Sequence, residues 1–331
     1  MSKTFMNIAG KCFLPVALGA LLLIGCSGGD STTGSQESTT SNGTIAISVL
    51  TTENPYFNVI IASLTEEAKK HGYEVLATSG EYDVARQQNQ VKDFIVKQVT
   101  AMVLCPCESK SIGPAIQEAN EAGIPVFTAD IACLAPNAKI VSHIATDNLG
   151  GGREAGRAMI EALGEAGGKV VILDYKSAES CLLRVQGFKE ILGAHNMAKP
   201  DSKIDIVMEL PGEGKKDRGY KAAEDAIQAH SDLAGIFAIN DPSALGARAA
   251  LEKAGKEDQV KIIGFDGQPE GKQAIKDGKI YADPVQFPAE IGRTTMQTIL
   301  SYLKGEEVKA EILIPTKLYR QSDGIADPEL K

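Results

Sequence analysis

The sequence lacks the motifs by which proteins usually bind structural metal ions. It contains no HExxH motif and no pair of CxxC motifs, and Cys105-Pro106-Cys107 does not have CxxC spacing. Its four histidines are dispersed along the chain, at His71, His143, His195 and His230. These spacings argue against a zinc site, so we expect neither a metal nor another cofactor.

The sequence also lacks an excess of positive charge. Its 331 residues include 34 Lys and Arg against 43 Asp and Glu, which gives a net charge of −9. Surfaces that bind nucleic acid are usually basic, so we expect no nucleic-acid partner. Apolar residues make up 43% of the chain, which predicts a packed core and argues against general disorder.

A hydrophobic run near the N-terminus is too short to cross a membrane. It covers residues 12–25, about 14 residues, whereas a membrane-spanning helix needs about 20. Lys3 and Lys11 precede the run, a pattern typical of an export signal. The run ends in Leu-Ile-Gly-Cys at residues 23–26, which resembles a bacterial lipobox with Cys26 as the lipidated residue.

Residues 1–25 are therefore predicted to be a lipoprotein signal peptide, and the small polar residues 26–43 a flexible tether. An ordinary signal peptide with a cysteine at this position by chance is the alternative. We expect an exported protein, lipid-anchored to a membrane and facing the periplasm or the cell exterior. Export permits a disulfide, although four buried thiols are the simpler interpretation of the remaining cysteines, Cys105, Cys107, Cys133 and Cys181.

From residue 44 onward, short apolar runs alternate with segments of helical periodicity. The run over 45–50 is typical of a strand buried on both faces, and apolar residues with helical spacing follow over 57–68. Some ten such units in two similar blocks predict an α/β fold of two doubly wound parallel sheets. A closed βα barrel is the alternative, but it would leave the elements beyond the eighth unit without a place.

Polar and aromatic side chains follow several of the predicted strands. Ligands of open parallel sheets bind beyond the carboxyl ends of the strands, so we expect these side chains to lie close together. Carboxylates and amides bind hydroxyl groups, and aromatic rings cover the C–H faces of sugars, so the set indicates a neutral polyhydroxyl ligand. No nucleophile–base pair occurs among its members, which are Glu53, Asn54, Tyr56, Phe57, Asp130, Asn240, Asp241, Asp266 and Gln286.

Helix capping is the alternative interpretation of three members of this set. Asp130, Asn240 and Asp266 each precede a predicted helix, and Asp and Asn are favoured at helix N-caps. For any one of them a cap is the simpler role. Four separate strand ends that carry such groups favour a binding site.

Six short motifs resemble those of the type I periplasmic sugar-binding proteins, and within that family those of the bacterial ribose-binding proteins. Each motif is weak alone, but six in the right order over about 44–320 are specific. They are Asn54-Pro55-Tyr56-Phe57, the segment 141–148 before a glycine run, Arg184-Val185-Gln186-Gly187-Phe188, Ala238-Ile239-Asn240-Asp241, Gly264-Phe265-Asp266-Gly267 and Gln286-Phe287-Pro288.

The resemblance implies two lobes, joined by hinge strands, that close on a ligand. Lobe 1 would comprise residues 44–146 and 287–314, and lobe 2 residues 147–286 and 315–331. The implied ligand contacts come from both lobes and the hinge: Asn54, Tyr56, Phe57, Asp130, Arg184, Asn240, Asp266 and Gln286. Asp130 and Arg184 are expected to be hydrated in the open cleft, so replacing either should leave the ligand-free stability nearly unchanged.

Two positions depart from the ribose-binding pattern. Ile131 stands where that group has an arginine, and Gly214 where it has an aromatic residue. Both changes remove a contact and leave room, which favours a ligand other than ribose. Cys105 or Cys107 follows a strand end and is expected to line the cleft.

The resemblance implies the solute-binding component of an ABC importer, a monomer that passes a ribose-like sugar or polyol to a membrane permease without performing chemistry. A sensor that reports ligand occupancy to a chemoreceptor or signalling system is an alternative that the sequence leaves open. A carbohydrate-active enzyme would need two opposed carboxylates, such as Asp130 and Asp266. Arg184 and Asn240 favour binding over catalysis.

Overall fold

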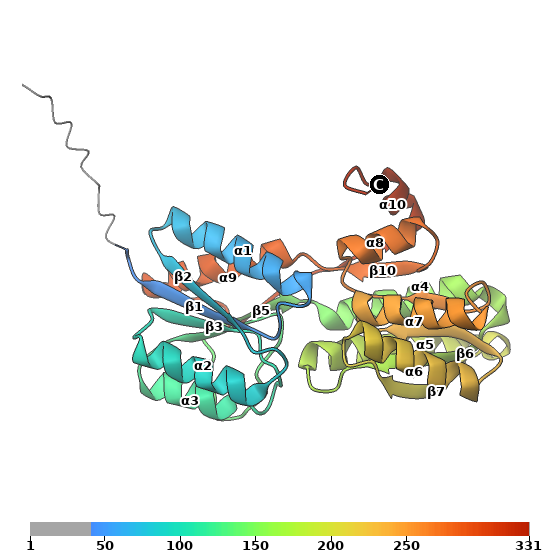
Figure 1. Ribbon diagram of the computed structural model, residues 1–331, viewed down its shortest axis with the longest axis horizontal. Coiled ribbons are helices and arrows are strands. Elements are labelled where there is room, and N and C mark those ends of the chain that lie inside the picture. Colours follow the sequence, from blue (N-terminus) through green and yellow to red (C-terminus); the bar gives the residue numbers. More distant parts are fainter. Residues whose placement is uncertain (1–40, 331) are drawn as a thin grey trace, which may run out of the picture. The chain divides into compact units, whose positions relative to one another are not determined.

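The computed structural model describes residues 41–330, which form two lobes that are each built around a six-stranded sheet (Figure 1). The predicted signal peptide, the predicted lipid site Cys26 and most of the predicted tether lie outside the described residues.

The sheet of the first lobe has the strand order β11–β5–β4–β3–β1–β2, with all neighbours parallel. Its central strands are continuous apolar runs because helices cover both faces, α1 and α9 on one and α2 and α3 on the other (Figure 1). The elements are β1 (Thr44–Val49), α1 (Pro55–Lys70), β2 (Glu74–Ser79), α2 (Val84–Val96), β3 (Ala101–Leu104), α3 (Gly113–Glu121), β4 (Val126–Ala129), β5 (His143–Thr146), α9 (Pro288–Leu303) and β11 (Glu311–Ile314).

The sheet of the second lobe has the order β12–β10–β9–β8–β6–β7. Alternate residues of β6 belong to separate cores: Val170 and Ile172 pack with α4 and α5, and Val171 and Leu173 with α6 and α7. The elements are α4 (Asn148–Leu163), β6 (Gly168–Asp174), α5 (Glu179–Ala198), β7 (Ile204–Pro211), α6 (Lys216–Ala229), β8 (Leu233–Ala238), α7 (Asp241–Ala254), β9 (Lys261–Ile263), α8 (Pro269–Lys276), β10 (Ala282–Val285), β12 (Lys317–Arg320) and α10 (Gln321–Ala326).

The predicted fold class, two doubly wound sheets joined by hinge strands, is confirmed, with one exception at a sheet edge. Strand β12 runs antiparallel to β10, whereas the other strand pairs of both sheets are parallel. The reason is the direction of the chain. It re-enters the second lobe from the hinge after β11, so β12 runs away from the hinge while its neighbour β10 runs toward it.

Three short segments connect the lobes, and they are hydrogen-bonded to one another. They lie between β5 and α4, between β10 and α9, and between β11 and β12. The backbone N–H of Asp147 donates to the carbonyl of Ile314 at 2.8 Å, and the Thr146 hydroxyl donates to Gln286 Oε1 at 2.6 Å. All three crossings are thereby joined in one hinge.

Helices α4 and α5 of the second lobe cross at two glycines. A Cβ atom on Gly152 would lie 2.1 Å from the carbonyl oxygen of Arg184, and one on Gly187 would lie 2.2 Å from that of Leu149. Both obstacles are backbone atoms of the facing helix. The close crossing therefore depends on the absence of a side chain at both positions, and it sets where Arg184 lies.

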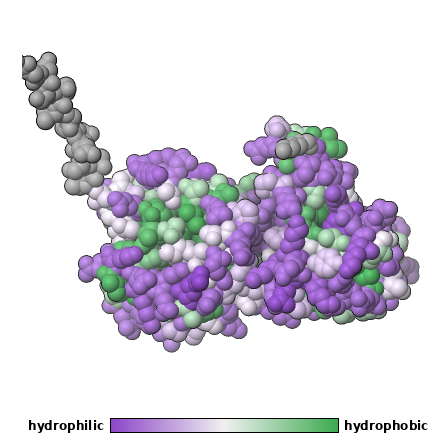
Figure 2. All heavy atoms as spheres, in the orientation of Figure 1, coloured by the Kyte–Doolittle hydropathy of each residue, from purple (hydrophilic) through white to green (hydrophobic). Residues whose placement is uncertain are grey.

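On the face shown in Figure 2, hydrophilic residues cover much of the second lobe and the region where the lobes meet, and a group of hydrophobic residues lies on the first lobe near α1 and β2. Within residues 41–330 the helices are all too short or too polar to cross a membrane.

Candidate ligand-binding site

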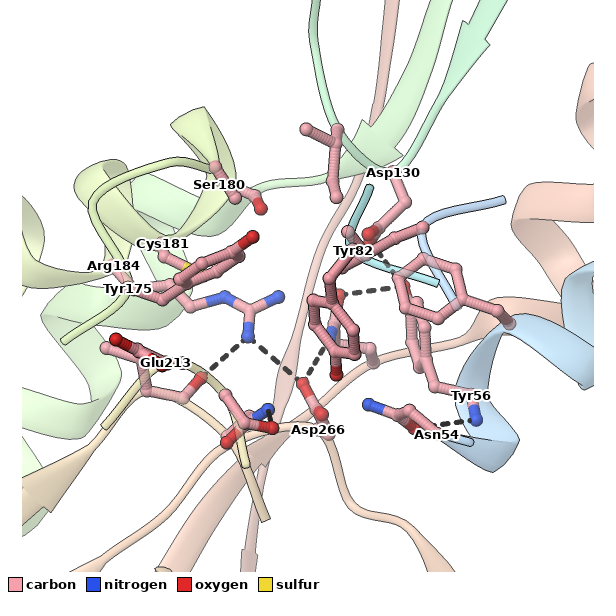
Figure 3. A pocket seen from close by; sticks show the side chains of 18 residues that line it. Asn54, Tyr56, Tyr82, Asp130, Tyr175, Ser180, Cys181, Arg184, Glu213 and Asp266 are labelled. Carbon is pink, nitrogen blue, oxygen red and sulfur yellow. Dashed lines mark hydrogen bonds and ion pairs between the residues drawn. The ribbon is translucent and has the colours of Figure 1, made fainter. Parts of the chain in front are cut away.

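A pocket of about 40 Å³ lies between the lobes, beyond the carboxyl ends of the parallel strands. Figure 3 shows side chains of the first lobe on one side of it and side chains of the second lobe on the other. The structure brings together at this pocket every residue of the implied contact set, namely Asn54, Tyr56, Phe57, Asp130, Arg184, Asn240, Asp266 and Gln286.

Arg184 forms a buried ion pair with Asp266 at the base of the pocket. Its Nη1 donates to Asp266 Oδ1 at 3.0 Å and to the carbonyl of Ile239 at 2.7 Å, and its Nε donates to Asn148 Oδ1 at 2.8 Å. The guanidinium also stacks 3.9 Å from the centre of the Phe265 ring. Every one of these partners belongs to the second lobe, so the arginine is held in position by its own lobe.

Both members of this ion pair are buried, which affects the pKa of Asp266. Arg184 and Asp266 are 4% and 5% exposed. Burial raises the pKa of Asp266, and the neighbouring guanidinium opposes that shift. Of the arginine's five N–H groups, those on Nη2 have no hydrogen-bond partner among the described residues and remain for a ligand.

On the opposite side of the pocket, Tyr56 connects Asp130 to the hinge. Its hydroxyl lies 2.7 Å from Asp130 Oδ1 and 2.9 Å from Gln286 Oε1. Gln286 in turn donates to Asp266 Oδ1 at 2.6 Å, which joins the carboxylates of the two lobes in one hydrogen-bonded chain. Burial raises the pKa of Asp130 to about 6, against the opposing effects of Arg184 and the Tyr56 hydroxyl.

Both pocket carboxylates lie on left-handed backbone. Asp130 follows β4 with φ of +64°, and Asp266 follows β9 with φ of +102°. Residues other than glycine rarely adopt such angles, and the cost is about 1–3 kcal/mol where they do. Strain of this kind is concentrated at functional sites, and here it turns one carboxylate from each lobe toward the same pocket.

Helix capping explains two of the pocket residues but neither of the carboxylates. The Asn54 side chain accepts from the N–H of Tyr56 at 2.9 Å and caps α1, and that of Asn240 accepts from Ser243 at 3.1 Å and caps α7. Asp130 and Asp266 instead bind side chains of the pocket. The capping hypothesis therefore holds for Asn240 and is wrong for Asp130 and Asp266.

The lobes touch directly along one side of the pocket. The Ser109 N–H donates to the carbonyl of Ser177 at 3.1 Å, and the Glu179 N–H donates to the Ser109 hydroxyl at 3.0 Å. The Tyr175 hydroxyl donates to the carbonyl of Cys107 at 3.2 Å. These contacts join a loop of the first lobe to a loop of the second, so the structure shows the closed form of the cleft.

Several pocket residues were missed by the search of strand ends. Tyr175 directly follows β6, and Tyr82 is the third residue after β2; their rings meet edge to face at 6.5 Å between centroids (Figure 3). An aromatic residue just beyond a strand was a usable signal for both. The other missed residues are Leu50, Ala178, Ser180, Cys181, Glu213 and Ile239, which carry no such signal.

The positions that depart from the ribose-binding pattern, Ile131 and Gly214, also line the pocket. The expectation that Cys105 or Cys107 would line it is wrong, because both thiols are buried in the core of the first lobe and Cys181 lies at the pocket instead. The four cysteines of the described part of the chain are all free thiols.

A second pair of carboxyl groups, Asp241 and Asp283, lies fully buried in the second lobe. Oδ1 of Asp241 and both carboxyl oxygens of Asp283 have no donor within residues 41–330, and Gly264 and Gly271 leave the space that these groups fill. Burial raises the pKa of both carboxyls, and the charge of Asp283 raises that of Asp241 further. We therefore expect the two carboxyls to share one proton.

This pair predicts a stability that falls as the pH rises. A carboxyl whose pKa is raised by folding stabilises the folded state fully below its unfolded pKa, and this contribution is lost as the pH rises through the raised value. We expect Asp283→Asn to raise the melting temperature at pH 8 by roughly 2–8 °C, from about 1–2 kcal/mol, and to have less effect at pH 5. Calorimetric scans at both pH values measure it, with the exposed Asp201→Asn as control; a lower melting temperature at pH 8 would contradict the shared proton.

Comparisons with known proteins agree with this geometry. Residues 45–307 match the model of the periplasmic binding protein domain. The ribose import binding protein of Escherichia coli (strain K12) is 36% identical over 276 residues, which cover 83% of this chain and 90% of that protein.

Solved structures with the same fold carry different small polyhydroxyl ligands. A solute-binding protein of an ABC transporter from Actinobacillus succinogenes, solved with D-allose, has a TM-score of 0.78 at 25% identity and covers 86% of this chain and 100% of its own. Another from Mycobacterium smegmatis, solved with glycerol, has a TM-score of 0.78 at 29% identity and covers 86% of this chain and 96% of its own. The resemblance drawn from six motifs is confirmed, and the chain belongs to the periplasmic binding protein family.

Proposed function

We propose that the protein binds a monosaccharide-like sugar or polyol between its lobes and is the solute-binding component of an ABC importer. The observation that carries the proposal is the pocket itself. It presents the free Nη2 of Arg184, the second carboxylate oxygen of Asp130 and the rings of Tyr56 and Phe57 to one shared space. Such groups bind the hydroxyls and C–H faces of a neutral sugar.

The proposed ligand differs from ribose in at least one substituent. Ile131 offers no hydrogen bond at a position where the ribose-binding pattern has an arginine, and Gly214 offers no ring. The names of the relatives, a ribose import binding protein and proteins solved with D-allose or glycerol, support the ligand class.

The proposed lobes comprise residues 44–146 with 287–314 and residues 147–286 with 315–331, and they open about the three hinge segments. The ligand is released to a permease, which reads the closed form, and the protein acts as a monomer without catalysing a reaction. The names of the relatives, all binding proteins, support the absence of catalysis.

Ligand binding is tested by substitution of Asp130. We expect Asp130→Asn to weaken binding of the preferred sugar about ten- to a hundredfold, since a lost charged hydrogen bond costs about 1.5–3 kcal/mol. Asparagine tolerates the left-handed backbone of this residue, so the loop should keep its conformation. Titration calorimetry against D-ribose, D-allose, D-arabinose and glycerol measures the change.

Asp83→Asn is the matched control, because Asp83 is an exposed cap of α2 in the same lobe and asparagine caps helices equally well. Equal affinities of wild type and Asp130→Asn for every sugar that binds would refute the site. Failure of the wild type to bind any neutral sugar or polyol would refute the function.

A lipid anchor at Cys26 is the second part of the proposal, supported by the lipobox-like sequence at residues 23–26 and by the polar tether. Cys26→Ala should move the protein from the membrane fraction to the soluble fraction of fractionated cells. Cys133→Ala, on a cysteine inside the folded lobes, should leave it at the membrane. Membrane association that survives Cys26→Ala would refute lipidation at this residue.

A further inference from the structure

A groove of about 630 Å³ lies between the lobes beside the pocket. Glu53, Asn54, Pro55 and Tyr82 of the first lobe line it, and the rest of its wall comes from the second lobe. Asn54, Tyr82 and Gly214 line both the groove and the pocket, so the two spaces share a boundary. The pocket, at about 40 Å³, is much the smaller of the two spaces, so a ligand with more than one ring would extend from it into the groove.

Gly214 leaves this boundary without a side chain from the second lobe. Its φ of +67° is left-handed, and its carbonyl accepts a hydrogen bond from the Asn240 side chain at 3.1 Å. The backbone is thus held against a pocket residue, and a Cβ atom on Gly214 would lie 3.2 Å from the side-chain nitrogen of Asn240, so a larger residue here would narrow the boundary. The shared boundary at Gly214 is where a substituent on a sugar in the pocket would enter the groove.

Much of the accessible surface of the groove is apolar. Three prolines at the first turns of α1, α7 and α8, together with Leu245 and the Tyr82 ring, supply surfaces that suit the C–H faces of a sugar ring. The polar side chains Asn54 and Gln268 are placed to bind hydroxyl groups.

The charges of the groove favour a neutral occupant over an anion. Its two lysines are engaged: the Lys216 ammonium lies 2.9 Å from Glu270 Oε1, and the Lys215 ammonium lies 4.0 Å from the centre of the Tyr82 ring. Glu53 and Asp217 add negative charge to the same walls. The positive ends of the helices that begin here are balanced by these first-turn and loop acids, so little net attraction for a phosphate remains.

We propose that the ligand is a glycoside or disaccharide, with one sugar ring in the pocket and a second neutral unit in the groove. This proposal rests on the proposed function and names its substrate class. The second unit adds contacts with Tyr82, Leu245 and the prolines without displacing the groups that grip the first ring.

The test uses titration calorimetry on the purified full-length protein with two matched series of probes. One contains D-ribose, methyl ribofuranosides, a disaccharide with a ribosyl ring and D-ribose 5-phosphate; the other contains D-galactose, melibiose, lactose and D-galactose 6-phosphate. We expect at least one disaccharide or glycoside to bind at least tenfold more tightly than its monosaccharide. We expect the phosphates to bind no more tightly than the unmodified sugars.

Leu245→Trp tests the groove itself, because the larger side chain fills it while the pocket keeps its residues. The variant should lose the advantage of the disaccharide and keep the affinity for the monosaccharide within twofold. Leu182→Trp is the control, since Leu182 is a partly exposed leucine of the same lobe on a different surface. Gly214→Asn, which suits a left-handed backbone, narrows the boundary itself and should also reduce the advantage of the disaccharide; because Gly214 lines the pocket as well, its effect on the monosaccharide is measured separately.

The outcomes separate the two proposals. Monosaccharides that bind as tightly as every glycoside, or a disaccharide advantage that survives both Leu245→Trp and Gly214→Asn, would overturn the groove proposal and leave the sugar-binding function standing. If a sugar phosphate bound most tightly of all the probes, the proposal that the groove binds a neutral unit would be overturned. The absence of binding by all probes, monosaccharides included, would overturn the function itself.

Discussion

Arg184→Ala should both abolish tight ligand binding and destabilise the ligand-free protein by about 3–5 kcal/mol. The variant leaves the Asp266 carboxylate buried without its countercharge and removes the donor to the Ile239 carbonyl. Removing one partner of a buried ion pair costs that much because the remaining charge has no compensation. Chemical denaturation measures the stability, and titration calorimetry the affinity.

Two further variants separate the structural role of Arg184 from its role in binding. Arg153→Ala removes an exposed ion pair with Glu190 in the same lobe and should cost less than about 1 kcal/mol. The double variant Arg184→Met/Asp266→Asn leaves no unpaired charge and should recover much of the lost stability without recovering ligand binding. A stable Arg184→Ala protein would show that the pair contributes little to the fold.

Alanine substitutions at two glycines of helix α5 should change the stability of the protein in opposite directions. Gly187→Ala places a Cβ atom 2.2 Å from the carbonyl oxygen of Leu149 and 2.8 Å from the backbone nitrogen of Arg153, so α4 and α5 must move apart. Overpacking of this kind costs about 1–3 kcal/mol, and sometimes more where the obstacle is backbone. We also expect weaker ligand binding, because Arg184 lies one turn away on the displaced helix.

Gly193→Ala is the matched control in the same helix. A Cβ atom on Gly193 meets no atom within 4 Å, and alanine is favoured over glycine in a helix by about 1 kcal/mol. This variant should therefore be more stable than the wild type and bind its ligand equally well. Denaturant titrations of both variants measure the difference, and destabilisation of the two by similar amounts would contradict a close crossing at Gly187.

Much of the fold was predictable because its strands and helices carry strong local patterns. The strand over 45–50 and the helical spacing over 57–68 were expected from apolar spacing alone, and they correspond to β1 and α1. Strands β11 and β12 were not, since each has only four residues, is partly exposed and lies at a sheet edge. Their pairing depends on distant residues, and no local pattern encodes it.

The site was predictable in its members but not in its internal contacts. The strand-end rule and the family motifs found Asp130, Asn240 and Asp266, because parallel strands deliver their last residues to one edge. The sequence did not show that Asn148, Ile239 and Asp266 bind Arg184 within its own lobe, and these contacts argue against the expectation that Arg184 is freely hydrated in the open cleft. Such contacts depend on helix packing at Gly152 and Gly187, which spacing along the chain does not show.

The order in which the chain crosses between lobes constrains how the protein folds. The first lobe lacks α9 and its edge strand until residue 314 is available, and β11 pairs with β5, where Glu311 lies opposite His143. The second lobe is complete only with β12 at Lys317–Arg320. Long-range contacts of this kind slow folding. A growing chain can therefore finish the first lobe only after residue 314 has been made, and the second only after residue 320.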